Sequence, residues 1–585
     1  MEKIKKLTDM ISASFFEKLF ISWFFSGTAA IFTGGEDILL TAGNITSFII
    51  VFISFFVIAS CIEHMRKGSA KGILVVSVLI FALAFLVKSD SIFSFIPVAI
   101  FYCLAVYHFW SGRKKEPWKM PKKLTVALTV IIPLVFFGIA TAQSLLRYKT
   151  YSAPNFDFGI FSHMYYNMRT TFQPVSTCER DMLLSHFAVH FSPALYVFLP
   201  IYFVFPFPET VAVCQTLAIY SAVIPFILIG KKLNLSAKSL VLCAAIFAAS
   251  SALAGSSSYD FHENCLLVPF LMWMFYFYET KKTPLLFLFA ILTLMVKEDA
   301  FVYVAVFAVY IFISNKDYIK GIVLAVVAVV WFVAACSYLE QFGTGIMSYR
   351  YDAMVGENES LFGIIKTLIT NPAYSIQQIF STTDKSYTKV LYFLQMFCPV
   401  AFLPLITKKP SRMILVLPIL LNLLTDYSYQ YNVYFQYGFG IGSFLLYATI
   451  LNISDIEEEK RDFTALIAAG LAVMMYFTLF IPKVNDLAEK YVDKAEMYEE
   501  MDEVLAQIPE DKTITASTRL VPHLTNRKEI YASNYHKTAD TDYLVIDARF
   551  GITDEIQGEI DIFTAAGYEK INSGSDYILI YQPGS

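Results

Sequence analysis

The sequence contains few charged residues for its length. Only 16% of its 585 residues are Asp, Glu, Lys or Arg, whereas 56% are hydrophobic, and the mean hydropathy is +0.55. This composition excludes an ordinary soluble domain, because a surface exposed to water carries more charge. The net charge of −4 is near neutral, and no nucleic acid is expected among the partners.

Cysteine motifs are also missing. Most of the eight cysteines fall in or beside apolar runs, Cys178 lies in a polar loop, and there is no CxxC pair. A disulfide framework and a CxxC metal site are therefore excluded. The glycines of "GFGIG" at residues 438–442 lie in an apolar run, where close helix packing explains them better than phosphate binding does.

Long apolar runs dominate the rest of the sequence. A bilayer core of about 30 Å needs roughly 20 apolar residues per helix, and the alternation typical of a β-barrel is not seen. The sequence therefore predicts an all-α polytopic membrane protein. The predicted spans are 15–33, 46–62, 71–88, 92–110, 124–145, 209–230, 236–253, 264–280, 284–297, 298–314, 319–337, 388–407, 411–424, 433–451 and 462–482.

Basic loops give the predicted orientation. With the N-terminus in the cytoplasm, all the strongly basic loops fall on the cytoplasmic side, as the positive-inside rule requires. These loops are "EHMRKGSAKG", "SGRKKEPWKMPKK", "GKKLNLSAK", "ETKKTP", "NKDYIKG" and "TKKPSRM". Loops 146–191, 254–263 and 338–387 and the C-terminal tail are then extracytoplasmic.

For two segments the sequence allows more than one interpretation of the topology. The start, "MEKIKKLTDMISASFFEKLF", has basic residues before an apolar run, as a cleaved signal peptide does, but no convincing small-residue cleavage site follows, which favours an uncleaved first helix. Residues 190–208 are apolar but contain four prolines. A span there would invert every later loop, so we predict an interfacial or re-entrant helix.

The tail, residues 484–585, differs from the rest of the chain. "MYEEMDEVLAQIP" has helical spacing, while "KTITAS", "KEIYAS", "TDYLVIDAR" and "DYILIYQP" alternate or bunch like strands. The tail is therefore predicted to form a small extracytoplasmic α/β domain.

The first candidate for chemistry is Asp157, in the stretch "NFDFGIFSHMYYN" of residues 155–167. One interpretation is a helix N-cap for the segment that follows. The other is a functional carboxylate at the mouth of the membrane domain. A second external loop, "SSSYDFHENC", adds Asp260, His262 and Glu263. These groups could bind a divalent cation, or a phosphate through one, or could simply be solvated.

Three charged residues, Lys297, Glu298 and Asp299, interrupt the apolar stretch 284–314. One helix of that length would be about 46 Å long, so two shorter helices meeting at the charged residues are predicted. Ionisable groups at that depth cost several kcal/mol unless they are paired. A functional site is favoured, with a structural Lys–acid pair as the alternative.

Further candidates lie in neighbouring external segments. His186 and His190, four residues apart, would lie on one helix face and could bind metal or be ordinary interfacial histidines. Arg350 could anchor a phosphate through its guanidinium fork or be a simple loop cation. Gln436 and Tyr437 begin a span near the outer face, where an aromatic belt is the alternative interpretation.

Together these segments resemble two groups of proteins. The acids in successive external loops and the stretch "HFSPALYVFLPIYFVFPFPETVAVCQ" resemble the C-type (GT-C) glycosyltransferases. The ordered motifs "FDFGIFSH", "HFSPALY", "YDFHEN", "VKEDA", "RYDAMVG", "VPHLTNRKEIYAS" and "DYLVID" resemble more closely the uncharacterised membrane-protein family called domain of unknown function 2079. The likeness runs from about residue 125 to the end. It implies an added membrane module at 1–123, a GT-C-like module at 124–483 and a soluble domain at 484–585.

The resemblance also implies a reaction. A sugar would pass from a polyprenyl-phosphate donor in the bilayer to an extracytoplasmic glycan, lipid or protein acceptor, with inversion and with Asp157 as the base. Glu298 and Asp299 are further candidate catalytic groups. Asp260 and Glu263 are the candidate ligands of a Mg²⁺ or Mn²⁺ ion. The candidate substrate-binding residues are Lys297, Arg350, His190, His262, Gln436 and Tyr437.

Two other classes of function stay open. A transporter or flippase of a lipid-linked or anionic solute would use Lys297, Glu298 and Asp299 as a coupling site, although no second interrupted span forms an inverted repeat with them. A non-catalytic envelope scaffold would need no buried acid.

Overall fold

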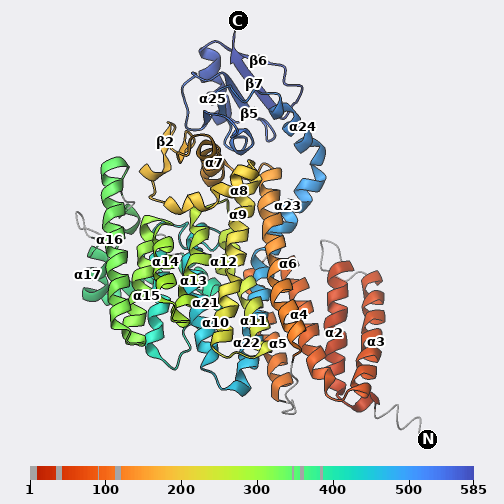
Figure 1. Ribbon diagram of the computed structural model, residues 1–585. Helices are drawn as coiled ribbons and strands as arrows, with labels where there is room; N and C mark the ends of the chain where they lie inside the picture. Colours follow the sequence, from red (N-terminus) through yellow and green to blue (C-terminus); the bar gives the residue numbers. More distant parts are fainter. Residues whose placement is uncertain are drawn as a thin grey trace.

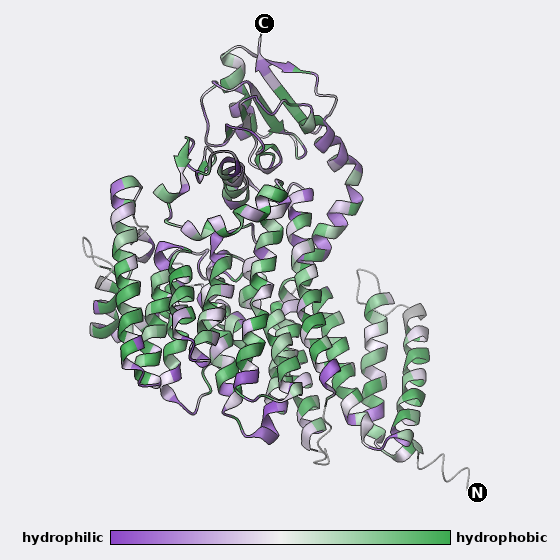
Figure 2. Cartoon of the chain, viewed as in Figure 1, coloured by the Kyte–Doolittle hydropathy of each residue, from purple (hydrophilic) through white to green (hydrophobic). Residues whose placement is uncertain are grey.

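The computed structural model describes residues 10–33, 42–89, 91–111, 120–345, 348–355, 362–382 and 386–584. It consists of a helical bundle and a small α/β domain at the C-terminal end (Figure 1). The predicted fold class is thus confirmed. In Figure 2 hydrophobic residues cover the bundle, whereas hydrophilic residues concentrate at its ends and in the C-terminal domain.

Ten helical segments of the described chain, some of which join two successive helices, are long and apolar enough to cross a membrane. They are Phe15–Thr33, Ile45–Met65, Ser69–Lys88, Ile92–Ser111, Lys122–Lys149, Pro208–Lys232, Ala237–Ser257, Tyr318–Phe342, Gln436–Ser454 and Glu458–Asp493. The protein is therefore a multi-pass membrane protein, because each of these segments satisfies its backbone groups internally while presenting apolar side chains.

The helices of the bundle and its loops follow one another in the order α2 to α23. Their bounds are α2 Phe15–Thr33, α3 Ala42–Met65, α4 Ser69–Lys88, α5 Phe95–Ser111, α6 Lys122–Lys149, α7 Ile160–Thr171, α8 Leu199–Val204, α9 Pro208–Ser221, α10 Val223–Lys232, α11 Ala237–Ala248, α12 Ser251–Ser257, α13 Leu267–Glu279, α14 Thr283–Leu294, α15 Phe301–Ser314, α16 Tyr318–Phe342, α17 Phe362–Thr370, α18 Pro372–Phe380, α19 Thr388–Phe397, α20 Leu420–Leu423, α21 Phe439–Ser454, α22 Glu458–Leu479 and α23 Ile481–Asp493.

Several predicted spans are shorter or less regular than expected. Helices α14 and α15 are separate and meet at a turn that contains the three charged residues, as predicted. The predicted span 388–407 stops at Phe397, because Pro399 follows and Ala401 and Phe402 take positive φ angles. The predicted span 411–424 is mostly a 3₁₀ helix, Pro410–Ile419.

Residues 190–208 do not form a helix of spanning length. They form a 3₁₀ turn, Pro193–Val197, and the six-residue α8, before α9 begins at Pro208. The repeated prolines lack the backbone N–H that a continuous helix needs. This agrees with the prediction that the segment does not span.

The first four helices pack onto the main bundle through α22. Helices α4 and α5 both contact α22, and the Tyr102 hydroxyl donates a hydrogen bond of 2.8 Å to the Leu466 carbonyl. The Tyr102 ring also packs against Gly470, where a Cβ would lie 2.1 Å from Tyr102 Cζ. The absent side chain permits this close approach.

The C-terminal domain contains one five-stranded sheet in the order β4-β3-β5-β7-β6. Strand β3 is parallel to β4 and β5, while β7 is antiparallel to β5 and β6. Helix α24 leads from α23 into the domain and α25 precedes β6 (Figure 1). The bounds are α24 Ala495–Ala506, β3 Ile514–Ala516, β4 Ile530–Ala532, β5 Tyr543–Asp547, α25 Asp554–Ala565, β6 Tyr568–Ile571 and β7 Ile578–Pro583.

This domain rests on the loop between α6 and α9. That loop carries α7, α8 and a short antiparallel hairpin of β1 Val175–Ser176 and β2 Leu184–Ser185 (Figure 1). Tyr151, Ile160 and Cys178 of the loop belong to the same buried cluster as Ile514 and Val545 of the sheet. The loop therefore completes the hydrophobic core of the domain.

Candidate active site

Asp157 lies in a tight turn between α6 and α7, directly before α7. Residues Asn155–Gly159 form a single π turn in which Asp157 has φ 61° and ψ −66°. These angles are near those of the rare γ-turn with positive φ, which is strained for a residue with a Cβ. Such strain costs about 1–3 kcal/mol and persists only where the surroundings impose it.

The structure rules out the N-cap interpretation of Asp157. Helix α7 begins at Ile160, its N-cap is Gly159, and no side chain caps it. Neighbouring Phe156 is exposed and Phe158 is buried. The carboxylate is therefore held in a strained turn without serving the following helix.

Gly159 permits this turn through lack of a side chain. A Cβ at this position would lie 2.8 Å from Asn155 Oδ1 and 3.1 Å from Val521 Cγ1. We expect Gly159→Ala to displace the turn and to lower the thermal unfolding temperature, because both neighbours are packed and must shift. Gly558→Ala is the matched control, since nothing lies within 4 Å of a Cβ there. Equal unfolding temperatures for the two variants would contradict this role of Gly159.

The environment of Asp157 favours its protonated form. Burial, followed by the nearby charges of Asp260 and Glu263, raises the pKa of Asp157 to about 7, while Lys297 and a hydrogen bond from Tyr259 oppose the shift. A carboxylate with a pKa near neutrality can both accept and release a proton at physiological pH.

Asp260 has a cationic partner that is not among the predicted site residues. Arg147, at the end of α6, donates from Nη2 to both Asp260 oxygens at 3.0 Å and from Nε to Oδ1 at 3.1 Å. The Asp260 side chain is 2% exposed. This is a bidentate buried pair, the geometry in which Arg binds carboxylates most strongly.

Glu263 and Lys297 form a second buried pair. Lys297 Nζ lies 3.2 Å from Glu263 Oε1, and His262 Nδ1 lies 3.1 Å from Oε2. The Glu263 side chain is fully buried and Lys297 is 6% exposed. A segment between α12 and α13 is thereby joined to the turn between α14 and α15.

The two acids of the predicted cation site, Asp260 and Glu263, are each paired with a cationic side chain. Both carboxylates already face positive side chains, Arg147 and Lys297 respectively. Over the ranges that the structure describes, no group of three or more His, Cys, Asp or Glu side chains is placed to hold a metal ion. The Mg²⁺ or Mn²⁺ ion stays a prediction, and no step proposed below depends on it.

Glu298 and Asp299 differ in their surroundings although they are adjacent. Glu298 Oε1 lies 2.8 Å from His190 Nδ1, and its Oε2 accepts a hydrogen bond of 3.1 Å from the Phe191 amide. Asp299 is exposed, and its side chain makes no hydrogen bond or ion pair with another described residue. Glu298 thus holds the loop at residues 190–191 in place, and Asp299 is the free carboxylate of the two.

Arg350 lies against two tyrosines. Its guanidinium carbon is 4.4 Å from the Tyr427 ring centroid and 5.7 Å from that of Tyr437, and Nη1 donates to the Tyr437 hydroxyl at 3.3 Å. Gln436 beside Tyr437 is buried. Arg350 and Tyr437, predicted separately as substrate-binding residues, are thus in direct contact.

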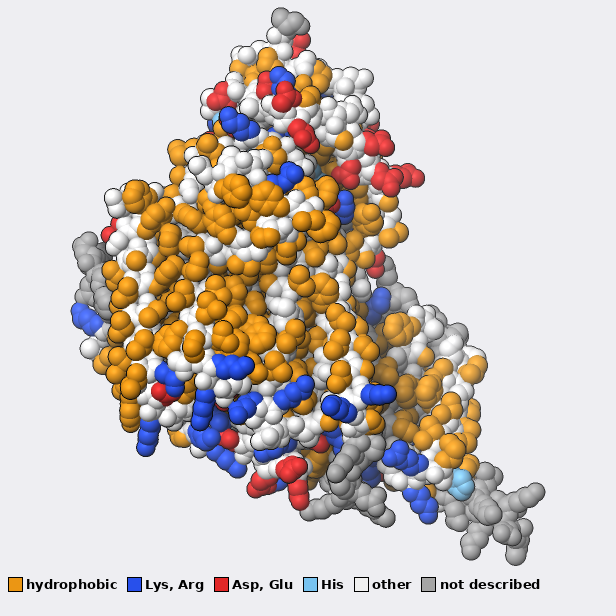
Figure 3. All heavy atoms as spheres, viewed as in Figure 1, with side chains coloured by type: hydrophobic (Ala, Val, Ile, Leu, Met, Phe, Trp, Pro, Cys, Tyr) orange, Lys and Arg blue, Asp and Glu red, His pale blue; other side chains and the backbone are white. Residues whose placement is uncertain are grey.

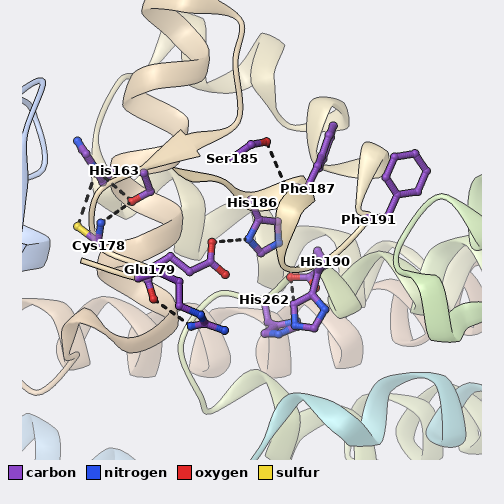
Figure 4. A network of polar contacts seen from close by, with 12 residues as sticks. His163, Cys178, Glu179, Ser185, His186, Phe187, His190, Phe191 and His262 are labelled. Atoms are coloured by element: carbon purple, nitrogen blue, oxygen red, sulfur yellow. Dashed lines mark hydrogen bonds and ion pairs between the residues drawn. The ribbon is translucent and has the colours of Figure 1, made fainter. Parts of the chain in front are cut away.

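The sequence predicts that His186 and His190 lie on one face of a helix. In the structure they do not share an α-helix. His186 begins a 3₁₀ turn of three residues, because β2 ends directly before it. The His186 and His190 ring centroids are 5.9 Å apart, but each ring has its own acid: His186 Nδ1 lies 3.0 Å from Glu179 Oε2, and His190 binds Glu298. Figure 4 shows Glu179 and His186 pointing toward each other and His190 near His262.

Sequence reasoning missed Arg147, Glu179 and Tyr259. One signal was available for Arg147: it is a cation at the predicted outer end of a span, against the positive-inside tendency, and such a charge needs a partner. Glu179 and Tyr259 had no distinguishing pattern, since each is an ordinary loop residue whose role depends on contacts across the fold.

Comparison with known proteins places the chain in a family. The family described as "Predicted membrane protein (DUF2079)" matches residues 147–563. The fold is similar to that of ArnT from Cupriavidus metallidurans bound to undecaprenyl phosphate, with 8% identity, 80% of this chain and 100% of that chain covered, and a TM-score of 0.49. The apo form of the same protein gives 8% identity, coverages of 79% and 99%, and a TM-score of 0.40. No curated protein matches the chain. Because the family match covers most of the chain, this protein belongs to the DUF2079 family of predicted membrane proteins.

Proposed function

We propose that the protein is a membrane glycosyltransferase that takes a sugar from a polyprenyl-phosphate donor and transfers it to an extracytoplasmic acceptor. The observation that carries the proposal is Asp157: a carboxylate in a strained turn, with a pKa near neutrality, next to buried acids and cations from other loops. Strained backbone and displaced pKa values concentrate at functional sites. The sequence motifs that resemble GT-C enzymes support the donor class.

In this reaction Asp157 acts as a general base. Its carboxylate takes the proton of the acceptor hydroxyl, the acceptor oxygen forms a bond to the anomeric carbon, and the bond from that carbon to the phosphate oxygen breaks. The electron pair leaves with the polyprenyl phosphate. Lys297 and Arg350 supply positive charge for the leaving phosphate. A single displacement inverts the anomeric centre.

Sidedness supports this assignment. Figure 3 shows Lys and Arg side chains gathered at the end of the bundle opposite the C-terminal domain. Under the positive-inside rule that end faces the cytoplasm, and the C-terminal domain and Asp157 are then extracytoplasmic. In the same proposal, residues 1–123 are an added membrane module, 124–483 the catalytic module and 484–585 the soluble domain.

The test is a transfer assay with purified protein and synthetic polyprenyl-phosphate sugars. Release of polyprenyl phosphate measures turnover with any acceptor, including water. Ion-coupled solute uptake by proteoliposomes, without such release, would favour a transporter in which Lys297, Glu298 and Asp299 bind the solute or ion.

The rate should depend on pH through Asp157. A general base acts in its ionised form, so a pKa of about 7 predicts a rate that rises roughly tenfold per pH unit below about pH 7 and levels off above it. The groups that face Asp157 and set this midpoint are Asp260, Glu263, Lys297 and Tyr259. The measurement is kcat/KM for donor consumption from about pH 5 to 9, and a rate independent of pH below 7 would remove Asp157 as the base.

A further inference from the structure

The central edge of the C-terminal sheet has the geometry of a ligand-binding edge. Strands β3 and β5 are parallel neighbours. After β3 the chain continues to β4, on one side of this pair, and after β5 it continues to β6 and β7, on the other side. In open α/β sheets, ligands bind outside the carboxyl ends of such strands, at the point where the connections diverge. Residues 517–519 and 547–549 lie there.

In this protein the same edge binds the segment that carries Asp157. Thr518 Oγ1 accepts a hydrogen bond of 3.2 Å from the Asn155 amide. Arg549 donates from Nη1 to the Thr150 carbonyl and from Nη2 to the Tyr151 carbonyl, both at 3.2 Å. The guanidinium is itself fixed by Asp547, whose Oδ2 lies 2.7 Å from Nη2.

The 3₁₀ turn Val521–Leu524 forms a second contact on this segment. The His523 ring stacks on Tyr148 and Tyr151, with ring centroids 4.1 and 3.7 Å apart, and His523 Nε2 lies 3.1 Å from the Tyr148 carbonyl oxygen. Burial, followed by the nearby charge of Lys149, lowers the pKa of His523 to about 3, so the stacked ring is neutral. Val521 packs against Gly159.

The chain on the other side of Asp157 is held as well. Thr177 Oγ1 donates to the Ile530 carbonyl at 2.5 Å and accepts from the Ile530 amide at 3.1 Å. His163 Nε2 lies 3.1 Å from the Arg527 carbonyl oxygen. The contacts of the domain therefore flank the strained turn on both sides in sequence.

We propose that the C-terminal domain is a positioning element for Asp157: the carboxyl edge of β3 and β5 fixes the backbone of residues 148–159 and thereby imposes the strained turn. The inference rests on the proposed function for its catalytic consequence. It assigns Thr518, His523 and Arg549 as positioning residues that act through the Asp157 backbone. A strained turn relaxes when the contacts that impose it are removed.

The sharpest test is Thr518→Val in the full-length protein. Valine keeps the shape of threonine but offers no acceptor to the Asn155 amide. We expect kcat for donor consumption to fall about 10- to 100-fold with KM within about twofold, since small displacements of a reacting group cost that much. We also expect the pH midpoint to move below 7, because a relaxed turn exposes the Asp157 carboxylate to water. Hydrogen exchange at Asn155 should become faster.

Two matched variants complete the test. Thr518→Ser retains the hydroxyl and should restore kcat, the midpoint and slow exchange. Thr553→Val removes a comparable acceptor for a backbone amide, that of Ile556 at the start of α25, away from the turn, and should leave all three unchanged. If hydrogen exchange at Asn155 is faster in Thr518→Val but the wild-type protein transfers no sugar, the positioning role is supported and the proposed function is wrong. If the wild-type protein transfers sugar, but Thr518→Val changes neither hydrogen exchange at Asn155 nor the pH midpoint of the rate, only the positioning role is wrong.

Discussion

Asp157→Asn is expected to lower the rate of sugar transfer by roughly 10²- to 10⁴-fold, the contribution of a general base. Asparagine has nearly the same size but cannot accept a proton. The neighbouring carboxylates cannot take over, because Asp260 is bound by Arg147 and Glu263 by Lys297. The measurement is release of polyprenyl phosphate from a purified donor at a fixed pH above 7, where wild-type Asp157 is ionised.

The control for this substitution is Asp352→Asn. Asp352 is an exposed loop carboxylate close in sequence to Arg350, and the same chemical change there should leave turnover within about twofold, as expected for a surface position. Asp352→Asn should keep the thermal unfolding temperature of the wild type, as expected for an exposed position. Asp157→Asn should keep that temperature or raise it slightly, since loss of a desolvated charge relieves its desolvation cost. Turnover that survives Asp157→Asn would end the assignment of this residue as the base.

Arg147→Met is expected to lower the free energy of unfolding by about 3–5 kcal/mol, more than any other substitution described above. The substitution leaves the Asp260 carboxylate, which is 2% exposed, without its bidentate partner in a place that water reaches poorly. Methionine retains the apolar stem, so the loss isolates the missing charge. Thermal unfolding in detergent, followed with a fluorescent thiol or tryptophan probe, measures the effect.

A double variant and a surface pair provide the controls. Arg147→Met with Asp260→Asn removes both charges and should recover most of the lost stability. Lys149→Met breaks the pair with Glu209, in which the side chains are 43% and 29% exposed, and should cost less than about 1 kcal/mol. If the double variant were no more stable than Arg147→Met, the Arg147–Asp260 pair would not be the source of the effect.

The secondary structure of the C-terminal domain was predictable where the pattern was strong. The alternating segments "KTITAS", "KEIYAS", "TDYLVIDAR" and "DYILIYQP" became β3, β4, β5 and β7, and "MYEEMDEVLAQIP" became α24. Helix α25 was missed because Gly558 in its middle lowers helix propensity and its acids obscure the apolar face. Strand β6, "YEKI", was too short to signal itself.

The sequence indicated several members of the candidate site but none of the pairings between them. The sequence placed Asp157, Asp260, Glu263 and Lys297 on one side of the membrane, and they lie close enough for their charges to act on one another. It did not pair Asp260 with Arg147, 113 residues away, or Thr518 with Asn155, 363 residues away. No local pattern encodes contacts at such separations.

The sequence by itself determined the class of the protein: apolar runs of spanning length must become membrane helices, because backbone groups in lipid have to be satisfied internally. It also determined the candidate acids, since ionisable residues at the ends of such helices are costly and few. Only the tertiary structure decided which of these acids are paired with a cation. Asp260 and Glu263 are paired with cations from other segments, Arg147 and Lys297. Asp157 instead lies in a strained turn, its pKa is raised, and its segment is held by a domain that begins more than three hundred residues later. Protonation and backbone strain depend on what surrounds a residue in space, and that is set by packing between segments distant in the chain.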